Sequence, residues 1–280
     1  MQSKRCNLHK IKYEMSITLV IFGVLLTGVL VVSLTLYLLQ EKFILHAEKL
    51  PWSYNFRFAG DFEELNLMMS DGVNQNGILF KTNNSKGLIM LMHGHSGNVE
   101  HWGTIAYRFN KLNYDLLVID YRGYGKSEGK FSEQDTFLDV QQWYKHMNSI
   151  YSESEITLYG KGIGSTFASY LASKFSPNKL ILESPLYDLK FTALKYYPLF
   201  PFIRYIPTYK FDTAAYFKKI RIPVYMVHGK LNKLVHYENS TKLLAANTGY
   251  ADLCLIEDGD HHNLVKHPTY IQYVVSLLEA

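Results

Sequence analysis

Hydrophobic positions follow two patterns in this chain, one near the N-terminus and another over the rest. Residues Ser16–Leu39 contain no charged side chain, are dominated by Leu, Val and Ile, and have no polar face. As a helix this run would extend about 36 Å, enough to cross a hydrocarbon core about 30 Å thick. A cleaved signal peptide fits less well, because the run is too long and no small-residue cleavage pattern follows it. The pattern predicts a transmembrane helix over residues 16–39.

Beyond this helix, short apolar runs alternate with longer amphipathic stretches, a pattern typical of buried parallel strands covered by helices on both faces. The predicted strands are Leu88–Met92, Leu116–Ile119, Ile156–Tyr159, Leu180–Leu182, Val224–Val227 and Leu253–Ile256. The predicted helices are Val99–Leu112, Glu133–Met147 with Ser132 as N-cap, Ser165–Lys174, Tyr237–Ala246 and Tyr270–Leu278. More polar stretches at 62–69 and 77–81 predict an antiparallel hairpin. Together they predict an α/β fold with a doubly wound, mostly parallel sheet of about eight strands.

The same pattern divides the chain into segments. We expect a basic N-terminus over residues 1–15, a connector over 40–59 and one folded domain over 60–280. Residues 189–220 interrupt the alternation and predict a small cap over the carboxyl edge of the sheet. Its aromatic residues indicate packing on the core, with an apolar ligand pocket as the alternative. They include Tyr196, Tyr197, Phe200, Phe202, Tyr205 and Tyr209.

Charge adds an orientation and excludes one class of partner. Four basic residues precede the apolar run, whereas the basic residues that follow it are mixed with acids. The positive-inside rule therefore predicts a cytoplasmic N-terminus, with the domain on the periplasmic, extracellular or lumenal side. The net charge is only +4, and the sequence contains no block of basic residues. Nucleic acid is therefore not an expected partner. The two cysteines, Cys6 and Cys254, do not indicate a disulfide framework.

Five glycine- or histidine-containing segments each come directly after a predicted strand, which is where ligands bind in open α/β sheets. These segments are Leu91–Asn98, Asp120–Ser127, Tyr159–Ser165, Val227–Asn232 and Glu257–Leu264.

From about Gly60 onwards, these motifs and their order resemble the α/β-hydrolase superfamily. The His93-Gly94 turn, the loop Asp120–Ser127 and the sequence Leu182–Pro185 are similar to the membrane-anchored serine hydrolases related to budding-emergence and abhydrolase proteins. The resemblance implies hydrolysis of an ester, thioester or amide. An acyl-type ligand would suit the aromatic cap, and no cofactor is implied.

Two positions depart from the superfamily's catalytic pattern. The nucleophile of this fold stands at the centre of Gly-x-Ser-x-Gly, but Gly160–Gly164 has Gly162 there. The residue that matches the acid is Asn232, an amide that would favour the wrong histidine tautomer. The residue that matches the base is His261, with His262 as its competitor. The usual acyl-enzyme chemistry is therefore not expected.

The resemblance implies that the oxyanion hole of the superfamily is retained. The resemblance assigns the oxyanion donors to backbone amides after His93-Gly94 and at Ile163, with His95 and Ser96 in the same loop. Ser165 and Ser96 are the candidate replacement nucleophiles, although helix packing and loop capping explain them better. A metal site is not expected, because adjacent histidines do not converge on one ion and no carboxylate cluster joins them.

Three functional hypotheses follow. The leading one is a membrane-tethered hydrolase relative that is non-catalytic or strongly impaired and keeps a ligand pocket. The rival is an active hydrolase that uses a displaced nucleophile or water activated by His261. The third is a protein-interaction module with no occupied pocket, whose partner the sequence does not identify.

Overall fold

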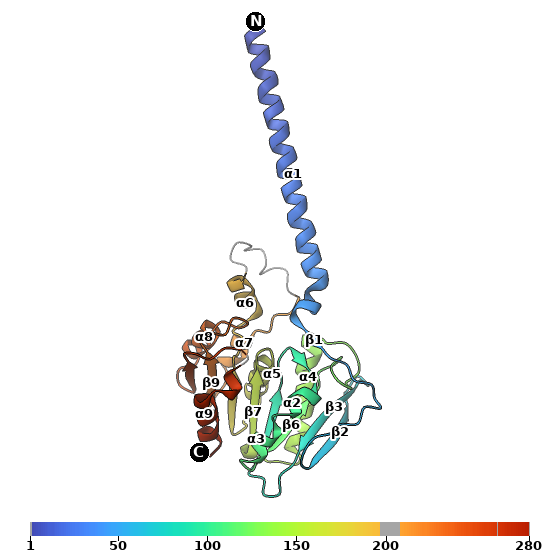
Figure 1. Ribbon diagram of the computed structural model, residues 1–280, viewed down its shortest axis with the longest axis vertical. Coiled ribbons are helices and arrows are strands. Elements are labelled where there is room, and N and C mark those ends of the chain that lie inside the picture. The colour runs from blue at the N-terminus through green and yellow to red at the C-terminus, as the bar shows by residue number, and fades with distance from the viewer. Residues whose placement is uncertain (1, 197–207, 262, 280) are drawn as a thin grey trace.

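A long helix extends from an α/β domain, whose central sheet is covered by helices on both faces (Figure 1). The computed structural model describes residues 2–196, 208–261 and 263–279. His262 and most of the cap aromatics (Tyr197, Phe200, Phe202 and Tyr205) therefore lie outside the described residues, as does the side chain of Tyr196.

The central sheet has eight strands in the order β10-β9-β8-β7-β4-β6-β3-β2. All neighbours pair in parallel except β2–β3 and β3–β6, which are antiparallel. The strand bounds are β2 Phe62–Met68, β3 Asn74–Phe80, β4 Leu88–Met92, β6 Asp115–Ile119, β7 Ile156–Lys161, β8 Lys179–Glu183, β9 Val224–Gly229 and β10 Ala251–Ile256. The predicted fold, including its antiparallel hairpin, is confirmed.

The helices follow the predicted segments with one difference. They are α2 Val99–Gly103, α3 Ala106–Asn110, α4 Glu133–Asn148, α5 Gly164–Ala172, α6 Leu189–Tyr196, α7 Thr213–Phe217, α8 Glu238–Ala246 and α9 Pro268–Glu279, with 3-10 turns at Glu153–Glu155 and Leu264–Lys266. Ser132 accepts a hydrogen bond from the Asp135 amide and is the predicted N-cap. The single helix predicted over 99–112 was wrong. The amides of Thr104 and Ile105 bond the carbonyls three residues back, on His101 and Trp102, at 3.4 and 3.3 Å, so a tight turn separates α2 from α3.

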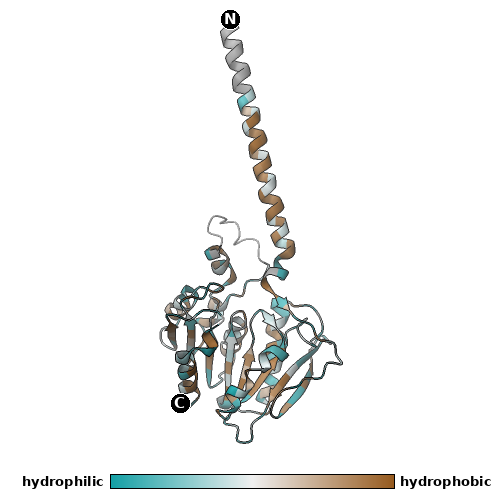
Figure 2. Cartoon of the chain, viewed as in Figure 1, coloured by the Kyte–Doolittle hydropathy of each residue, from teal (hydrophilic) through white to brown (hydrophobic). Residues whose placement is uncertain are grey.

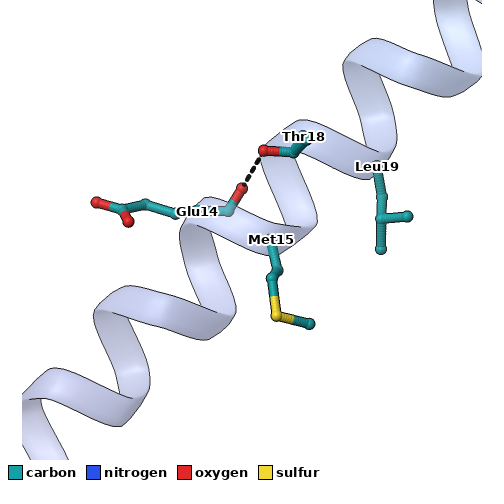
Figure 3. Close-up of a pocket in the computed structure, with 4 residues that line it drawn as sticks. All are labelled: Glu14, Met15, Thr18 and Leu19. Carbon is teal, nitrogen blue, oxygen red and sulfur yellow. Dashed lines mark hydrogen bonds between the residues drawn. The ribbon is translucent and has the colours of Figure 1, made fainter.

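Helix α1 (Gln2–Ile44) is longer than the predicted transmembrane run at both ends. Its segment Tyr13–Lys42 is long and apolar enough to cross a membrane, and none of its most apolar window is buried against the domain (Figure 2). Within it, Thr18 donates its hydroxyl to the Glu14 carbonyl at 2.9 Å (Figure 3). This hydroxyl is satisfied inside the helix, so it would not enter a membrane as an unpaired donor.

The segment after α1 is joined to the domain by backbone pairing. Strand β1 (His46–Ala47) pairs in parallel with β5 (Ser96–Gly97). The Gly125 amide donates to the Glu48 carbonyl at 2.8 Å. Part of the predicted connector is therefore a fixed edge of the folded domain.

Aromatic side chains fill the space between α5 and the end of the cap. Tyr209 is buried, stacks on Phe211 and contacts Phe131 with ring centroids 5.7 Å apart. Tyr209 thus packs on the core, as predicted for the cap aromatics, and does not form a ligand pocket.

Arg122 joins three parts of the fold through a buried ion pair. Its guanidinium donates to both carboxylate oxygens of Asp139 in α4 at 2.7 Å, and to Asp71 in the β2–β3 turn at 2.6 Å. The side chains of Arg122 and Asp139 are 8% and 3% exposed. Removal of one partner would leave the other charge buried without compensation.

We therefore expect Arg122→Met to lower the free energy of unfolding by about 3–5 kcal/mol. Thermal or denaturant unfolding of the detergent-solubilised full-length chain measures this loss. Lys81→Met is the matched control, because the Lys81–Glu63 pair has both side chains about half exposed, and such pairs contribute less than about 1 kcal/mol. Equal effects of the two substitutions would contradict the assignment.

Candidate active site

A tight turn joins β7 to α5 and carries the sequence Gly160–Gly164. Gly162, at its centre, has φ of +53°, the left-handed conformation that is strained for other residues. A Cβ built on Gly162 meets no atom within 4 Å, so the position has space for a side chain. A Cβ on Gly164 would instead lie 2.0 Å from the Met92 carbonyl oxygen, because α5 begins directly against the end of β4. The elbow backbone is present, with glycine at its centre.

The turn after β4 lies beside the elbow and is held by two tyrosines of the loop Asp120–Ser127. The Tyr121 hydroxyl donates to the His93 carbonyl at 2.9 Å, and the Tyr124 hydroxyl donates to the His95 carbonyl at 2.8 Å. Both tyrosines are buried. The loop Asp120–Ser127 therefore holds the predicted oxyanion turn in place through these two hydrogen bonds.

The two histidines of this turn have different surroundings. His93 is fully buried, contacts the Tyr121 ring, and makes a 2.8 Å hydrogen bond between Nδ1 and the Gly94 carbonyl. Burial lowers the pKa of His93 to about 4. His95 lines a cavity, and its pKa is lowered by burial and by the nearby His46 and Lys161. Of the two, His95 is placed to meet a ligand.

His261 and Asn232 come from the loops that follow β10 and β9. His261 lines the same cavity as Gly162 and lies across from His95, with ring centroids 6.5 Å apart. The Asn232 Oδ1 accepts the amides of Leu234 and Val235 at 3.0 and 2.9 Å. The Asn232 side chain thus holds its own turn.

A cluster of buried polar side chains around Glu183, which the sequence did not predict, lies beside the elbow. The Glu183 carboxylate at the end of β8 accepts hydrogen bonds from Lys161 at 2.5 Å, from Tyr159 at 2.7 Å and from Tyr270 at 3.1 Å. Burial acts to raise the pKa of Glu183, but the Lys161 ammonium and the hydrogen bonds hold it below its ordinary value. The sequence could have indicated this cluster. Tyr159 and Lys161 share one face of a buried strand, and a charged side chain there requires a partner.

The elbow, the oxyanion turn and this polar cluster line one cavity of about 1230 Å³. Its walls are mainly apolar, and the helices that contribute to them are α1, α2, α3, α6 and α9. The lining includes Leu36, Gln40, Ile44, Gly94, His95, Ser96, Trp102, Ile105, Phe109, Tyr159, Lys161, Gly162, Ile163, Glu183, Leu186, Leu189, Leu234, Val235, His261, Tyr270 and Val274. The volume exceeds the range of about 300–1,000 Å³ typical of small-molecule sites.

The two candidate serines differ in accessibility. Ser165 is fully buried, donates its hydroxyl to the Gly162 carbonyl at 2.5 Å and accepts the Leu186 amide at 3.3 Å. It is a packing residue, as the sequence favoured. Ser96 is partly exposed and lines the cavity. Among the residues that the structure describes, no group of three or more His, Cys, Asp or Glu side chains could hold a metal ion.

Comparison with known proteins agrees with this geometry. The family described as serine aminopeptidase, S33, matches residues 83–212. An esterase of Pyrococcus furiosus superposes with a TM-score of 0.69 at 18% identity, over 84% of this chain and 97% of that structure. An α/β hydrolase of Vibrio vulnificus superposes with a TM-score of 0.66 at 17% identity, over 78% of this chain and 81% of that structure.

Sequence relatives span viruses and eukaryotes. An uncharacterized protein of Acanthamoeba polyphaga mimivirus is 25% identical over 78% of this chain and 81% of its own length. The human alpha/beta hydrolase domain-containing protein 17C is 25% identical over 81% of this chain and 68% of its own length. An uncharacterized membrane protein of Saccharomyces cerevisiae is 29% identical over 49% of this chain and about half of its own length.

Sheet order, elbow and oxyanion turn define a hydrolase-type fold with glycine at the centre of its elbow. The chain has the α/β-hydrolase fold, and its sequence is similar to proteins of that superfamily.

Two buried histidines at this edge of the sheet, His93 and His228, predict that the stability of the fold depends on pH. In the neutral ring of His228, Nε2 donates to the Val235 carbonyl and Nδ1 accepts the Ser240 hydroxyl. Burial lowers the pKa of His228 to about 4, as it does for His93. The unfolded chain takes up these protons near the ordinary pKa of 6.5, whereas the folded chain does so only near 4. The free energy of unfolding should therefore fall between pH 6.5 and 4 by about 1.4 kcal/mol per pH unit for each histidine.

Unfolding of the full-length chain across this pH range tests the expectation. His228→Gln retains a donor and an acceptor but does not titrate, so it should reduce the slope by about half. A slope that stays unchanged in this variant would show that His228 is not buried as a neutral ring.

Proposed function

We propose that this chain is a membrane-anchored member of the α/β-hydrolase superfamily that binds an acyl-type ligand and does not perform serine hydrolysis. The observation that carries the proposal is Gly162. Its backbone keeps the elbow conformation and the space above it is open, yet it has no hydroxyl to attack a substrate. Loss of this hydroxyl removes about 10⁶ of turnover in a serine protease.

The contacts of Asn232 support the same conclusion. Its Nδ2 donates to Ser184 Oγ at 3.2 Å, while its oxygen is occupied by two backbone amides. It offers no free acceptor that would orient a catalytic histidine and stabilise its charged form.

The cavity supports a ligand with an apolar chain and a polar head group. Its walls are mainly apolar, and Lys161 and Glu183 form one charged pair among them beside Gly162. An arrangement of apolar walls with a few polar groups is typical of small-molecule sites, where the polar groups fix the ligand's orientation.

Membrane anchoring through α1 is part of the proposal. The apolar segment Tyr13–Lys42 supports it by length and composition. The excess of basic residues before the span supports a cytoplasmic N-terminus with the domain on the opposite side.

One observation favours a second candidate function, hydrolysis by a displaced nucleophile. Ser96 lines the cavity together with His95 and His261, two rings capable of proton transfer.

A fluorophosphonate probe applied to the detergent-solubilised full-length chain separates these functions. We expect no labelling of the native chain and strong labelling of Gly162→Ser/Asn232→Asp, because the elbow has space for the serine side chain. The gain should exceed about 100-fold, well inside the range that the missing hydroxyl controls. Esterase activity on short and medium acyl esters provides a second readout.

His261→Ala in the reconstructed background is the control and should abolish its labelling. Labelling of the native chain that disappears in Ser96→Ala would establish the displaced nucleophile and overturn the non-catalytic proposal.

A further inference from the structure

One face of the anchor helix forms part of the cavity wall. Leu36, Gln40 and Ile44 are spaced four residues apart on α1, so they share one side of the helix. All three line the cavity that contains Gly162 and His261. The cavity thus extends from the elbow to the base of the membrane helix.

The position of Leu36 places this part of the cavity at the edge of the hydrocarbon layer. Leu36 lies inside the uncharged run that ends at Leu39, and α1 continues without interruption to Ile44. The distance along the helix from Leu36 to Leu39 is about 4.5 Å. A bilayer that covers the apolar run therefore reaches the same helical turn that lines the cavity.

Side-chain hydrogen bonds hold the base of α1 to the end of the cap. Gln40 accepts the Thr208 amide at 2.6 Å and donates its own amide to Thr208 Oγ1 at 2.9 Å. The Tyr209 hydroxyl donates to Glu41 at 2.8 Å. Helix α1 is therefore part of the wall and not a mobile tether.

Backbone pairing ties the following residues to the oxyanion turn. His46 donates its amide to the His95 carbonyl at 2.8 Å, and the His46 and His95 rings meet edge to face at 5.4 Å. The anchor and the turn beside Gly162 are thus connected through two residues of β1. On the other side, α6 contributes Leu189, Thr192 and Ala193 to the cavity.

We propose that the cavity takes its ligand directly from the bilayer: a single-chain acyl amphiphile moves along the Leu36–Ile44 face of α1 and reaches the elbow without crossing water. Exposure of each methylene group to water is unfavourable, so long acyl chains remain in the membrane. A cavity whose wall is continuous with the span receives such a chain by lateral movement. This inference rests on the proposed ligand-binding function.

The test uses the full-length chain in phosphatidylcholine vesicles that contain a photoreactive long-chain fatty acid. Leu36→Trp fills the α1 side of the cavity and should lower the initial rate of cross-linking to cavity residues about tenfold. Leu38→Trp is the matched control, since Leu38 is 67% exposed and does not line the cavity. It should label like the native chain.

A water-soluble short-chain analogue of the probe is added from solution as a second readout. It distinguishes a block of entry from the bilayer from damage to the binding site itself. Selective loss of long-chain labelling in Leu36→Trp supports uptake from the bilayer. Long-chain labelling of Leu36→Trp at the native rate, or equal losses for the two probes, overturns the membrane route while the ligand site stands. Absence of labelling by either probe in the native chain overturns the proposed ligand function, and the route with it.

Discussion

Parallel pairing of β4, β7, β8, β9 and β10 is the constraint on which the site depends. Parallel strands place their carboxyl ends at one edge of the sheet, so the turns that follow them meet there. The elbow, the oxyanion turn, Glu183, Asn232 and His261 all come from these turns. The start of α5 packs so closely on the end of β4 that Gly164 has no room for a side chain. The elbow backbone is therefore fixed by packing and does not depend on the side chain at its centre.

The buried polar cluster shows what the site retains. A carboxylate removed from water is costly unless it is paired and hydrogen-bonded. Glu183 meets this requirement through Lys161 and the hydroxyls of Tyr159 and Tyr270. The result is one satisfied polar region in a mainly apolar cavity. Such a region gives a ligand a defined orientation whether or not any chemistry follows, which is consistent with a binding role for a chain whose elbow carries glycine.

The base of α1, the helix that we propose crosses the membrane, is bonded to this site. Strand β1 pairs with β5 beside the oxyanion turn, and Gln40 and Glu41 bond the end of the cap. The orientation of the domain relative to the helix is thereby restricted, with the carboxyl edge of the sheet on the side from which α1 extends (Figure 1). If α1 crosses a bilayer as proposed, this edge of the sheet faces that bilayer.

The sequence by itself determined the sheet, most of its helices and the identity of the elbow, because apolar periodicity and strand-to-turn motifs are local patterns. The resemblance carried by the order of those motifs also assigned the triad positions to Gly162, Asn232 and His261, and the structure places Gly162 and His261 in one cavity. The sequence missed the tight turn at Thr104 that separates α2 from α3, and it gave no role to Lys161 or Glu183. Only the tertiary structure decided that these two form a pair and that α1 lines the cavity. Both facts depend on contacts between segments distant in the chain, which no local pattern records.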